Sequence, residues 1–135
     1  MNANIDVAAA ALERARQLGQ QGRAEEAAGE YSRVLAAQPE HAEALAFFGT
    51  RELALGRAQQ AIEYLQRAAR ANPDEAQIQL SLGSAYFAAR RIDEACSALA
   101  RCLELEPKAY VARLQYAIAL EQSAKSEAAL PQYFS

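Results

Sequence analysis

Residue types that could carry out acid–base chemistry are few in this sequence and do not converge. His41 is the single histidine and stands in a predicted turn. A histidine acting as a general base needs a nucleophile or a carboxylate held close to it, and the sequence indicates neither. We therefore interpret His41 as a solvated turn residue. The carboxylate pairs Glu25-Glu26 and Asp93-Glu94 begin predicted helices, where negative charge stabilises the helix N-terminus.

The sequence likewise indicates no nucleophilic centre, no metal site and no phosphate-binding loop. The two cysteines, Cys96 and Cys102, are six residues apart, about 240° around a helix, so they point away from each other. We interpret both as buried, reduced thiols. The sequence contains no glycine-rich phosphate loop and no metal-ligand spacing. We therefore expect a protein that is not an enzyme and that holds neither a cofactor nor a metal.

Composition indicates a single helical domain. The chain has 135 residues, a length typical of one domain. Hydrophobic residues make up 52% but aromatic residues only 7%, and the abundant alanine favours closely packed helices. The net charge of −3 leaves no basic excess for binding nucleic acid. Because no signal peptide and no apolar run of ~20 residues occurs, we expect a cytoplasmic protein without membrane contact.

A repeat of 34 residues organises the chain. Pro39, Pro73 and Pro107 follow at this spacing, since 73 − 39 = 34 and 107 − 73 = 34. The same interval separates an alanine column, a column of large residues four positions later and an arginine column: Ala27, Ala61, Ala95 and Ala129; Tyr31, Leu65, Leu99 and Tyr133; Arg33, Arg67 and Arg101. Agreement of several columns at one interval indicates repeated structural units.

Each period has the pattern of two helices joined by a turn. In the second copy, apolar residues follow helical spacing from Ala44 onward, and Gly56 then interrupts the pattern. The second helix of that copy stops before Pro73, because the residue before a proline is displaced from the α-helical region. Gly22 and Gly56 suit the turns, where we expect a positive φ.

These columns resemble the tetratricopeptide repeat family. The residues that carry the resemblance are Leu45, Phe48-Gly49, Ala61, Leu65 and Pro73, then Leu82-Gly83, Tyr86, Ala95, Leu99 and Pro107. The first copy keeps only the second half of the pattern, since Arg14-Ala15 stands where the family has Leu-Gly. The resemblance implies an all-α, right-handed solenoid of antiparallel helix hairpins. It also implies one domain, residues 1–135, with repeats at about 8–41, 42–75 and 76–109 and a partial repeat at 110–135.

Packing explains why small and large side chains recur in columns. Glycines such as Gly49 are expected where two helices cross, with large residues filling the space beside them. Glu52 stands where the third copy has Tyr86, and a buried, unpaired carboxylate is costly. We therefore expect Glu52 to find a partner in the next hairpin, either Tyr86 or an arginine such as Arg90 or Arg91. The alternative is that the helix turns Glu52 into water.

The resemblance also implies a binding groove, because the first helix of each tetratricopeptide hairpin lines the inner, concave face. The side chains expected there are Leu12, Arg16, Glu43, Phe47, Thr50, Gln77, Leu80, Ser84, Phe87, Leu114 and Ile118. We expect Phe47 and Phe87 to face water and anchor a partner, with Arg16 and Glu43 setting its polarity. The alternative is that the two rings only fill space between adjacent helices.

One tetratricopeptide subclass grips chaperone C-termini through a carboxylate clamp of lysine, asparagine and arginine side chains. At the corresponding positions this sequence has Leu12, Arg16, Phe47, Gln77 and Ser81. The clamp is missing, so we expect a protein or peptide partner that is apolar or amphipathic.

The sequence thus predicts a protein- or peptide-binding scaffold, and two alternatives stay open. One is an N-terminal regulatory or substrate-positioning stem of a larger bacterial enzyme. Such repeats resemble those carried ahead of hydroxylase-, sulfotransferase- and glycosyltransferase-like catalytic domains. The other is a self-association module, with a possible homodimer formed through the C-terminal end.

The C-terminal end carries expectations of its own. The fourth copy stops without a polar capping helix, so we expect the chain to be a fragment of a longer protein. Its last segment, residues 125–135, is expected to form a short second helix with Pro131 in the first turn. Tyr133 would then pack back onto the first helix of its hairpin, and Phe134 would have little to cover it.

Overall fold

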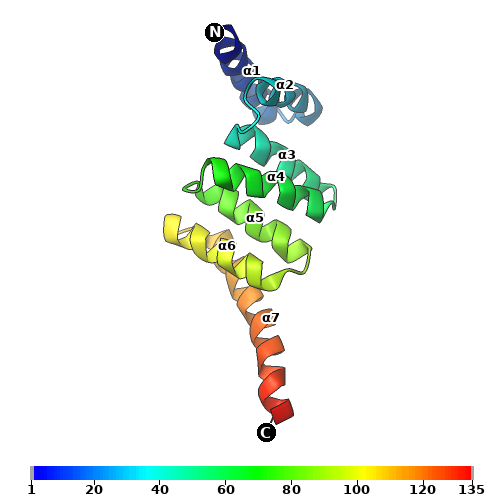
Figure 1. Cartoon of the computed structure of the whole chain (residues 1–135), viewed down its shortest axis with the longest axis vertical. Helices are drawn as coiled ribbons and strands as arrows, with labels where there is room; N and C mark the ends of the chain where they lie inside the picture. Colours follow the sequence, from blue (N-terminus) through cyan, green and yellow to red (C-terminus); the bar gives the residue numbers. More distant parts are fainter. Residues whose placement is uncertain (1, 135) are drawn as a thin grey trace.

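The computed structural model describes residues 2–134, with side chains described for residues 6–125. In this part of the chain the elements are α1 (Asn2–Gln20), α2 (Ala24–Ala37), α3 (Ala42–Ala54), α4 (Ala58–Ala71), α5 (Ala76–Ala88), α6 (Ile92–Leu105) and α7 (Tyr110–Phe134). The helices stack along the long axis of the molecule, and α7 leads away from the stack (Figure 1). The expected all-α solenoid of helix hairpins is confirmed.

Consecutive helices pair as antiparallel hairpins: α1 with α2, α3 with α4, and α5 with α6 (Figure 1). Neighbouring hairpins meet where α2 contacts α3 and α4 contacts α5, and α7 packs on α6 and α5. The core lies between helices. Ile62 and Leu65 of α4, for example, share a buried cluster with Leu82 of α5 and Ala95 of α6. Because a single hairpin cannot bury its apolar face, the stack gains its stability from neighbouring hairpins together.

Tight turns join the two helices of each hairpin at the 34-residue interval. Gly22, Gly56 and Arg90 occupy the same turn position, since 56 − 22 = 34 and 90 − 56 = 34, and their φ angles are 75°, 77° and 63°. The following residue donates its N–H back to the odd-numbered helix, as Arg57 does to the carbonyl oxygen of Glu52 at 2.8 Å. This is the left-handed helix ending that glycine favours. The expected positive φ is confirmed, and the third turn places an arginine in that conformation.

Glycines of α3 and α5 stand where the partner helix crosses. A Cβ atom at Gly49 would lie 2.5 Å from Cγ of Leu65, and one at Gly83 would lie 2.7 Å from Cγ of Leu99. Leu65 and Leu99 are both 0% exposed. The missing side chains let α3 approach α4, and α5 approach α6, closely enough for the leucines to fill the contact. The expected glycine crossings are confirmed.

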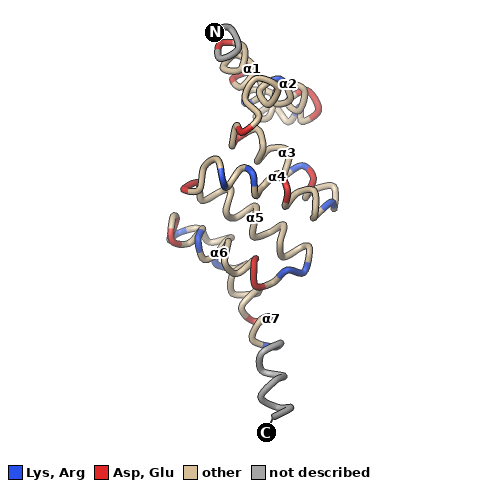
Figure 2. Tube along the Cα trace, viewed as in Figure 1, with Lys and Arg blue, Asp and Glu red and all other residues tan. Residues whose placement is uncertain are grey.

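In the arginine column, Arg67 and Arg101 tie α4 and α6 to the turn that precedes their hairpin. Arg67 on α4 donates from Nη2 to the carbonyl oxygen of Pro39 at 3.0 Å, and Arg101 on α6 donates from Nη2 to Oδ1 of Asp74 at 2.9 Å. Figure 2 shows charges of both signs interspersed along the stack. Exposed ion pairs contribute about 0–1 kcal/mol each, so helix packing stabilises the fold more than these ties do.

The expected partner of Glu52 is wrong. Oε2 of Glu52 accepts from Nη1 of Arg57 at 3.4 Å, so its partner lies in the turn of its own hairpin. The chain reverses between these residues, which brings the long arginine side chain back over the end of α3. Tyr86 instead accepts a hydrogen bond from Nε2 of Gln66 at 2.7 Å, and the guanidinium of Arg91 lies 5.0 Å from the centre of the Tyr86 ring.

The expected short final helix is also wrong, because α7 runs from Tyr110 to Phe134 without a turn. At the position of the earlier turns the fourth copy has Ala124, since 124 − 90 = 34, and alanine is a strong helix former. Pro131 therefore does not lie in the first turn of a separate helix. The expected packing of Tyr133 and the exposure of Phe134 concern side chains outside the described residues.

Gly49→Ala is expected to lower the free energy of unfolding by about 1–2 kcal/mol, because the new methyl group has to displace the buried Leu65. The matched control is Gly29→Ala in α2, where nothing lies within 4 Å of the added Cβ atom. This control should raise the free energy of unfolding by about 0.5–1 kcal/mol, since alanine favours helix. Urea denaturation measures both, and equal shifts in the two variants would contradict a close crossing at Gly49.

Arg90→Gly is expected to raise the free energy of unfolding by about 1 kcal/mol, because glycine adopts a positive φ without steric cost. The reciprocal control is Gly56→Ala, at the same position of the preceding turn. Nothing lies within 4 Å of the Cβ atom it adds, so its expected loss of about 1 kcal/mol would come from backbone conformation alone. Thermal and urea melts measure both variants. A neutral or destabilising Arg90→Gly would show that this turn stores no strain.

Candidate peptide-binding groove

The residues predicted to line the groove lie on the four odd-numbered helices. α1 carries Leu12 and Arg16, α3 carries Glu43, Phe47 and Thr50, α5 carries Gln77, Leu80, Ser84 and Phe87, and α7 carries Leu114 and Ile118. Those exposed to solvent are Arg16, Thr50, Gln77, Leu114 and Ile118, and the others are partly buried. The set therefore combines solvent-facing positions with side chains that also pack against the core.

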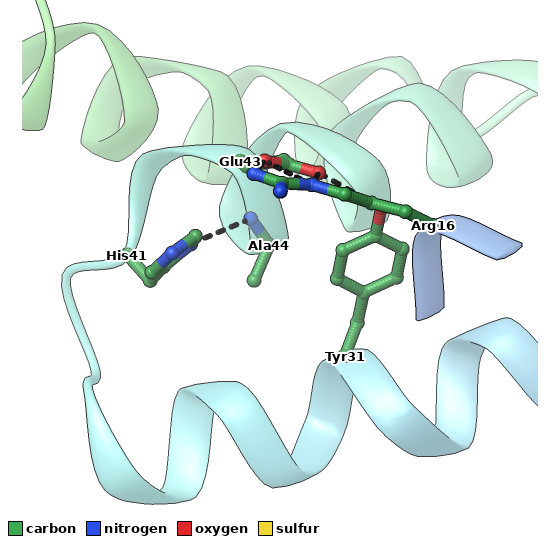
Figure 3. A network of polar contacts seen from close by, with 5 residues as sticks. All are labelled: Arg16, Tyr31, His41, Glu43 and Ala44. Carbon is green, nitrogen blue, oxygen red and sulfur yellow. Dashed lines mark hydrogen bonds and ion pairs between the residues drawn. The ribbon is translucent and has the colours of Figure 1, made fainter. Parts of the chain in front are cut away.

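A network of polar contacts joins the first two hairpins (Figure 3). Arg16 of α1 donates from Nη2 to Oε1 of Glu43 at 2.6 Å and from Nε to Oε2 at 2.9 Å. The Tyr31 hydroxyl of α2 donates to Oε2 of Glu43 at 3.2 Å. One carboxylate at the start of α3 thus holds side chains from both helices of the preceding hairpin. Two-point contacts between arginine and a carboxylate fix geometry as well as charge.

His41 positions the start of α3, which carries Glu43. Its Nδ1 accepts a hydrogen bond from the backbone N–H of Ala44 at 3.3 Å, as Figure 3 shows. Such a cap satisfies one of the N–H groups that a helix start leaves without a partner. The interpretation of His41 as a solvated turn residue is therefore wrong, because the side chain is partly buried and serves as the helix cap.

The contacts among Arg16, Tyr31 and Glu43 change the pKa of all three side chains. Hydrogen bonding to Arg16 lowers the pKa of Glu43 below its ordinary value of 4.5, against the opposing effect of partial burial. Burial and the charge of Glu43 raise the pKa of Tyr31 to about 12. The hydrogen bond to Glu43 also raises the pKa of Arg16. At neutral pH the network therefore holds a carboxylate, a guanidinium and a neutral phenol.

The two phenylalanines expected as anchors are only partly accessible. Phe47 stacks on Tyr31 with ring centroids 4.4 Å apart, and it meets Phe48 edge-on at 5.3 Å. Phe87 packs against two core clusters, one of which contains Leu82 and the other Leu99. Each ring fills space between helices and keeps part of its surface open. The packing role, one of the two alternatives, is therefore present in both rings, and the anchoring of a partner stays a prediction.

Among the aliphatic and hydroxyl side chains of the candidate set, some pack against neighbouring helices and others are exposed to solvent. Leu80 packs against the cluster of Leu99. Ser84 donates to Oε1 of Gln115 at 2.7 Å, which links α5 to α7. Leu114 and Ile118, in contrast, are 63% and 40% exposed. The accessible apolar part of the candidate groove therefore lies on α7.

A hollow of about 680 Å³ opens beside the polar network. It is lined by Arg16, Gln38, Pro39, Glu40, His41, Ala42, Glu43, Ala71 and Asn72. These residues come from α1, the connection between α2 and α3, the start of α3 and the end of α4. Arg16 and Glu43 are the predicted groove residues among them, and a second hollow of about 450 Å³ includes Phe87 in its lining.

Sequence reasoning missed Tyr31 and the connection between α2 and α3 as parts of this site. Tyr31 enters the repeat pattern only as a large packing residue, and its hydroxyl has no counterpart in the leucines of the same column. The signal for His41 is its place directly before a predicted helix, where a side-chain acceptor caps the helix. No comparable signal marks Gln38 or Asn72 as lining the hollow.

The cysteines lie on α6, away from the polar network. Cys102 is buried and Cys96 partly buried, both are free thiols, and burial raises the pKa of each. Among residues 6–125, no three histidine, cysteine or acidic side chains gather as metal ligands. None of the helices, over the residues described, is long and apolar enough to cross a membrane.

Helix hairpins stacked at a 34-residue interval, with glycine crossings and left-handed turns, define a helical-repeat protein. A family model described as tetratricopeptide repeat matches residues 12–49 and 48–109. The chain belongs to the tetratricopeptide repeat family. No curated protein matches its sequence.

Solved structures share the fold. A mutant of the Thermobaculum terrenum O-GlcNAc transferase is 26% identical, with a TM-score of 0.79, over 89% of this chain. The chain spans only 23% of that enzyme's length. The first tetratricopeptide domain of Spaghetti (RPAP3), bound to an HSP90 peptide, is 23% identical with a TM-score of 0.78, over 88% of this chain and 94% of the domain. The second such domain of human RPAP3, in complex with an HSP70 peptide, is 20% identical with a TM-score of 0.74, over 86% of this chain and 97% of the domain.

Glu43→Gln is expected to destabilise the fold at neutral pH and to matter less in acid. Because folding lowers the pKa of Glu43, its contribution is present above the ordinary value of 4.5 and is lost as pH falls through the folded pKa. The difference in unfolding free energy between wild type and Glu43→Gln should therefore shrink below pH 4.5. Urea melts from neutral pH into acid measure it, with Glu63→Gln on the exposed side of α4 as the control. A difference that stays constant in acid would contradict the network.

Proposed function

We propose that this chain is a scaffold that binds a peptide segment of a partner protein along α1, α3, α5 and α7. The observation that carries the proposal is the open hollow beside α1 and α3, which takes in the candidate groove residues Arg16 and Glu43. Similar arrays support it, since the two RPAP3 domains are solved with an HSP90 and an HSP70 peptide. A groove of this kind recognises an extended or helical segment through a few anchoring side chains.

The candidate groove changes in polarity from one end to the other. Beside α1 and α3 it carries the Arg16–Glu43 ion pair and the exposed Thr50. On α7 it carries Leu114 and Ile118, both exposed. A partner with a polar part and an apolar part matches this arrangement, so we infer an amphipathic peptide. The partly buried Phe47 and Phe87 then serve as the base on which such a peptide rests.

Charge pairing argues against a chaperone-type carboxylate clamp. Arg16 is the one basic residue of the candidate set, and Glu43 takes up its charge through two hydrogen bonds. Gln77 and Ser81 bring no positive charge to the clamp positions of α5. A C-terminal carboxylate would therefore have to compete with Glu43 for a single guanidinium. We infer that apolar contact contributes more to binding than carboxylate recognition does.

A second candidate function is that of a stem that positions substrates for a catalytic domain in a longer protein. The supporting observation is the match to the Thermobaculum terrenum O-GlcNAc transferase, whose chain is far longer than this one. The reading frame that encodes this chain, followed past Ser135, tests the idea. A catalytic domain there would support it, and an immediate stop codon would exclude it.

Ile118→Ser is expected to weaken peptide binding by about thirtyfold, the equivalent of about 2 kcal/mol for a hot-spot residue. The probe is an amphipathic peptide selected on the full chain from a random library, with Kd measured by titration calorimetry. Arg16→Gln should weaken binding of the same peptide about tenfold, because Arg16 contacts the polar part of the peptide.

The matched control is Leu55→Ser, at an exposed apolar residue (56% exposed) in the turn between α3 and α4. It should bind the peptide like the wild type. A peptide that binds Ile118→Ser and Arg16→Gln as tightly as the wild type would place its site elsewhere and refute the proposed groove.

A further inference from the structure

One side of α7 carries a stripe of exposed residues that borders the candidate groove at Leu114. We call it the α7 seam and define it as Tyr110, Arg113, Ala117, Leu120, Glu121 and Ala124, all of which are exposed. Their intervals of three and four residues place them along one side of the helix. Ile118 points away from this side, because successive residues of a helix are about 100° apart.

The corresponding side of the preceding odd-numbered helix is covered by an antiparallel helix. Gly83 of α5 lies under Leu99 of α6, and Ala117 follows it at 117 − 83 = 34. Tyr86 of α5 is 8% exposed, whereas Leu120, 34 residues later, is 44% exposed. Because α7 runs unbroken from Tyr110 to Phe134, none of the residues that the structure describes turns back over this side. The α7 seam thus has the form of a surface that receives an antiparallel helix.

The α7 seam is also complementary to itself. Arg113 lies four residues before Ala117 and Glu121 four residues after it, while Tyr110 and Ala124 lie seven residues before and after it. In an antiparallel pair of α7 helices with a two-fold axis at Ala117, Arg113 of each copy is level with Glu121 of the other. Tyr110 is level with Ala124, which sets a large side chain beside a small one. A parallel pair would bring like charges together.

We propose that the α7 seam joins two copies of this chain through an antiparallel pair of α7 helices centred on Ala117. Each copy presents the same surface to the other, as a two-fold symmetric interface requires. The small side chain of Ala117 lets the two helices approach closely, as Gly83 does between α5 and α6. Two Arg113–Glu121 ion pairs, one in each direction, select the antiparallel orientation.

Contacts within one chain leave Arg113 and Glu121 able to form these pairs. Nη2 of Arg113 donates to the carbonyl oxygen of Pro107 at 2.5 Å, and Oε1 of Glu121 lies 3.4 Å from Nζ of Lys125. A guanidinium has further donors and a carboxylate has a second oxygen. Glu121 and Lys125 are 67% and 74% exposed, so their own pair adds little and gives way easily.

Sedimentation equilibrium of the full chain over a range of concentrations tests the proposal, and the wild type is expected to show a reversible monomer–dimer equilibrium. Arg113→Glu and Glu121→Arg should each weaken dimerisation by about tenfold or more, and the double variant, which exchanges the two charges, should restore it. Ala117→Glu places bulk and like charge at the two-fold axis and should remain monomeric. Ile118→Ser, on another side of the same helix, should dimerise like the wild type.

All the substituted side chains are exposed, so each variant is expected to keep the helix content of the wild type. Circular dichroism checks this. A chain that stays monomeric at every concentration would overturn the proposal, because the α7 seam would then not join two copies. Dimerisation that Ala117→Glu leaves unchanged, or that the charge exchange does not restore, would overturn it as well. In that case a different surface or orientation joins the copies.

Discussion

The second and third hairpins depend on the contact between a glycine of one helix and a leucine of the next, and in the first hairpin Ala15 and Tyr31 take these positions. At Gly49 and Gly83 the two helices of a hairpin lie so close that an added Cβ atom would be 2.5 Å from Cγ of Leu65 and 2.7 Å from Cγ of Leu99. That separation fixes how far the turn must reach and which side of the hairpin remains apolar for its neighbour. The fold thus repeats one kind of helix–helix contact at an interval of 34 residues.

This dependence explains why the sequence predicts the fold so well. The proline, alanine and glycine columns each mark a local requirement that few other residue types meet, so the amino-acid spacing alone indicates helices, turns and crossings. The sequence does not predict a contact where more than one residue could satisfy the same packing or pairing requirement. Glu52 stands in a packing column, but the neighbouring turn brings Arg57 within reach, and spacing alone does not reveal that. Ala124 leaves α7 unbroken where the earlier copies turn, because helix propensity outweighs the repeat pattern there.

The candidate groove is less predictable than the fold, because its properties arise between hairpins. The sequence places Arg16 and Glu43 on the correct helices. Their pairing, however, depends on the angle between two hairpins that only one short connection joins. The partial burial of Phe47 comes from Tyr31, a residue whose column indicates packing within its own hairpin. Repeat patterns therefore locate a surface, while contacts between unlike repeats decide which of its side chains remain available to a partner.

The ties made by the arginine column have a consequence for how such a chain changes over evolutionary time. Arg67 reaches the backbone carbonyl of Pro39 and also lies 3.6 Å from Oε1 of Glu40, so the tie uses both the shape of the preceding turn and its acidic side chain. At Arg101 the acceptor is the carboxylate of Asp74, which lies in the corresponding turn. A hairpin gained or lost by recombination between repeats would meet an acceptor of this kind at its new boundary. The junctions after α2 and α4, with Glu40 and Asp74, are therefore interchangeable in this respect, whereas the junction after α6 has Lys108 at the same position.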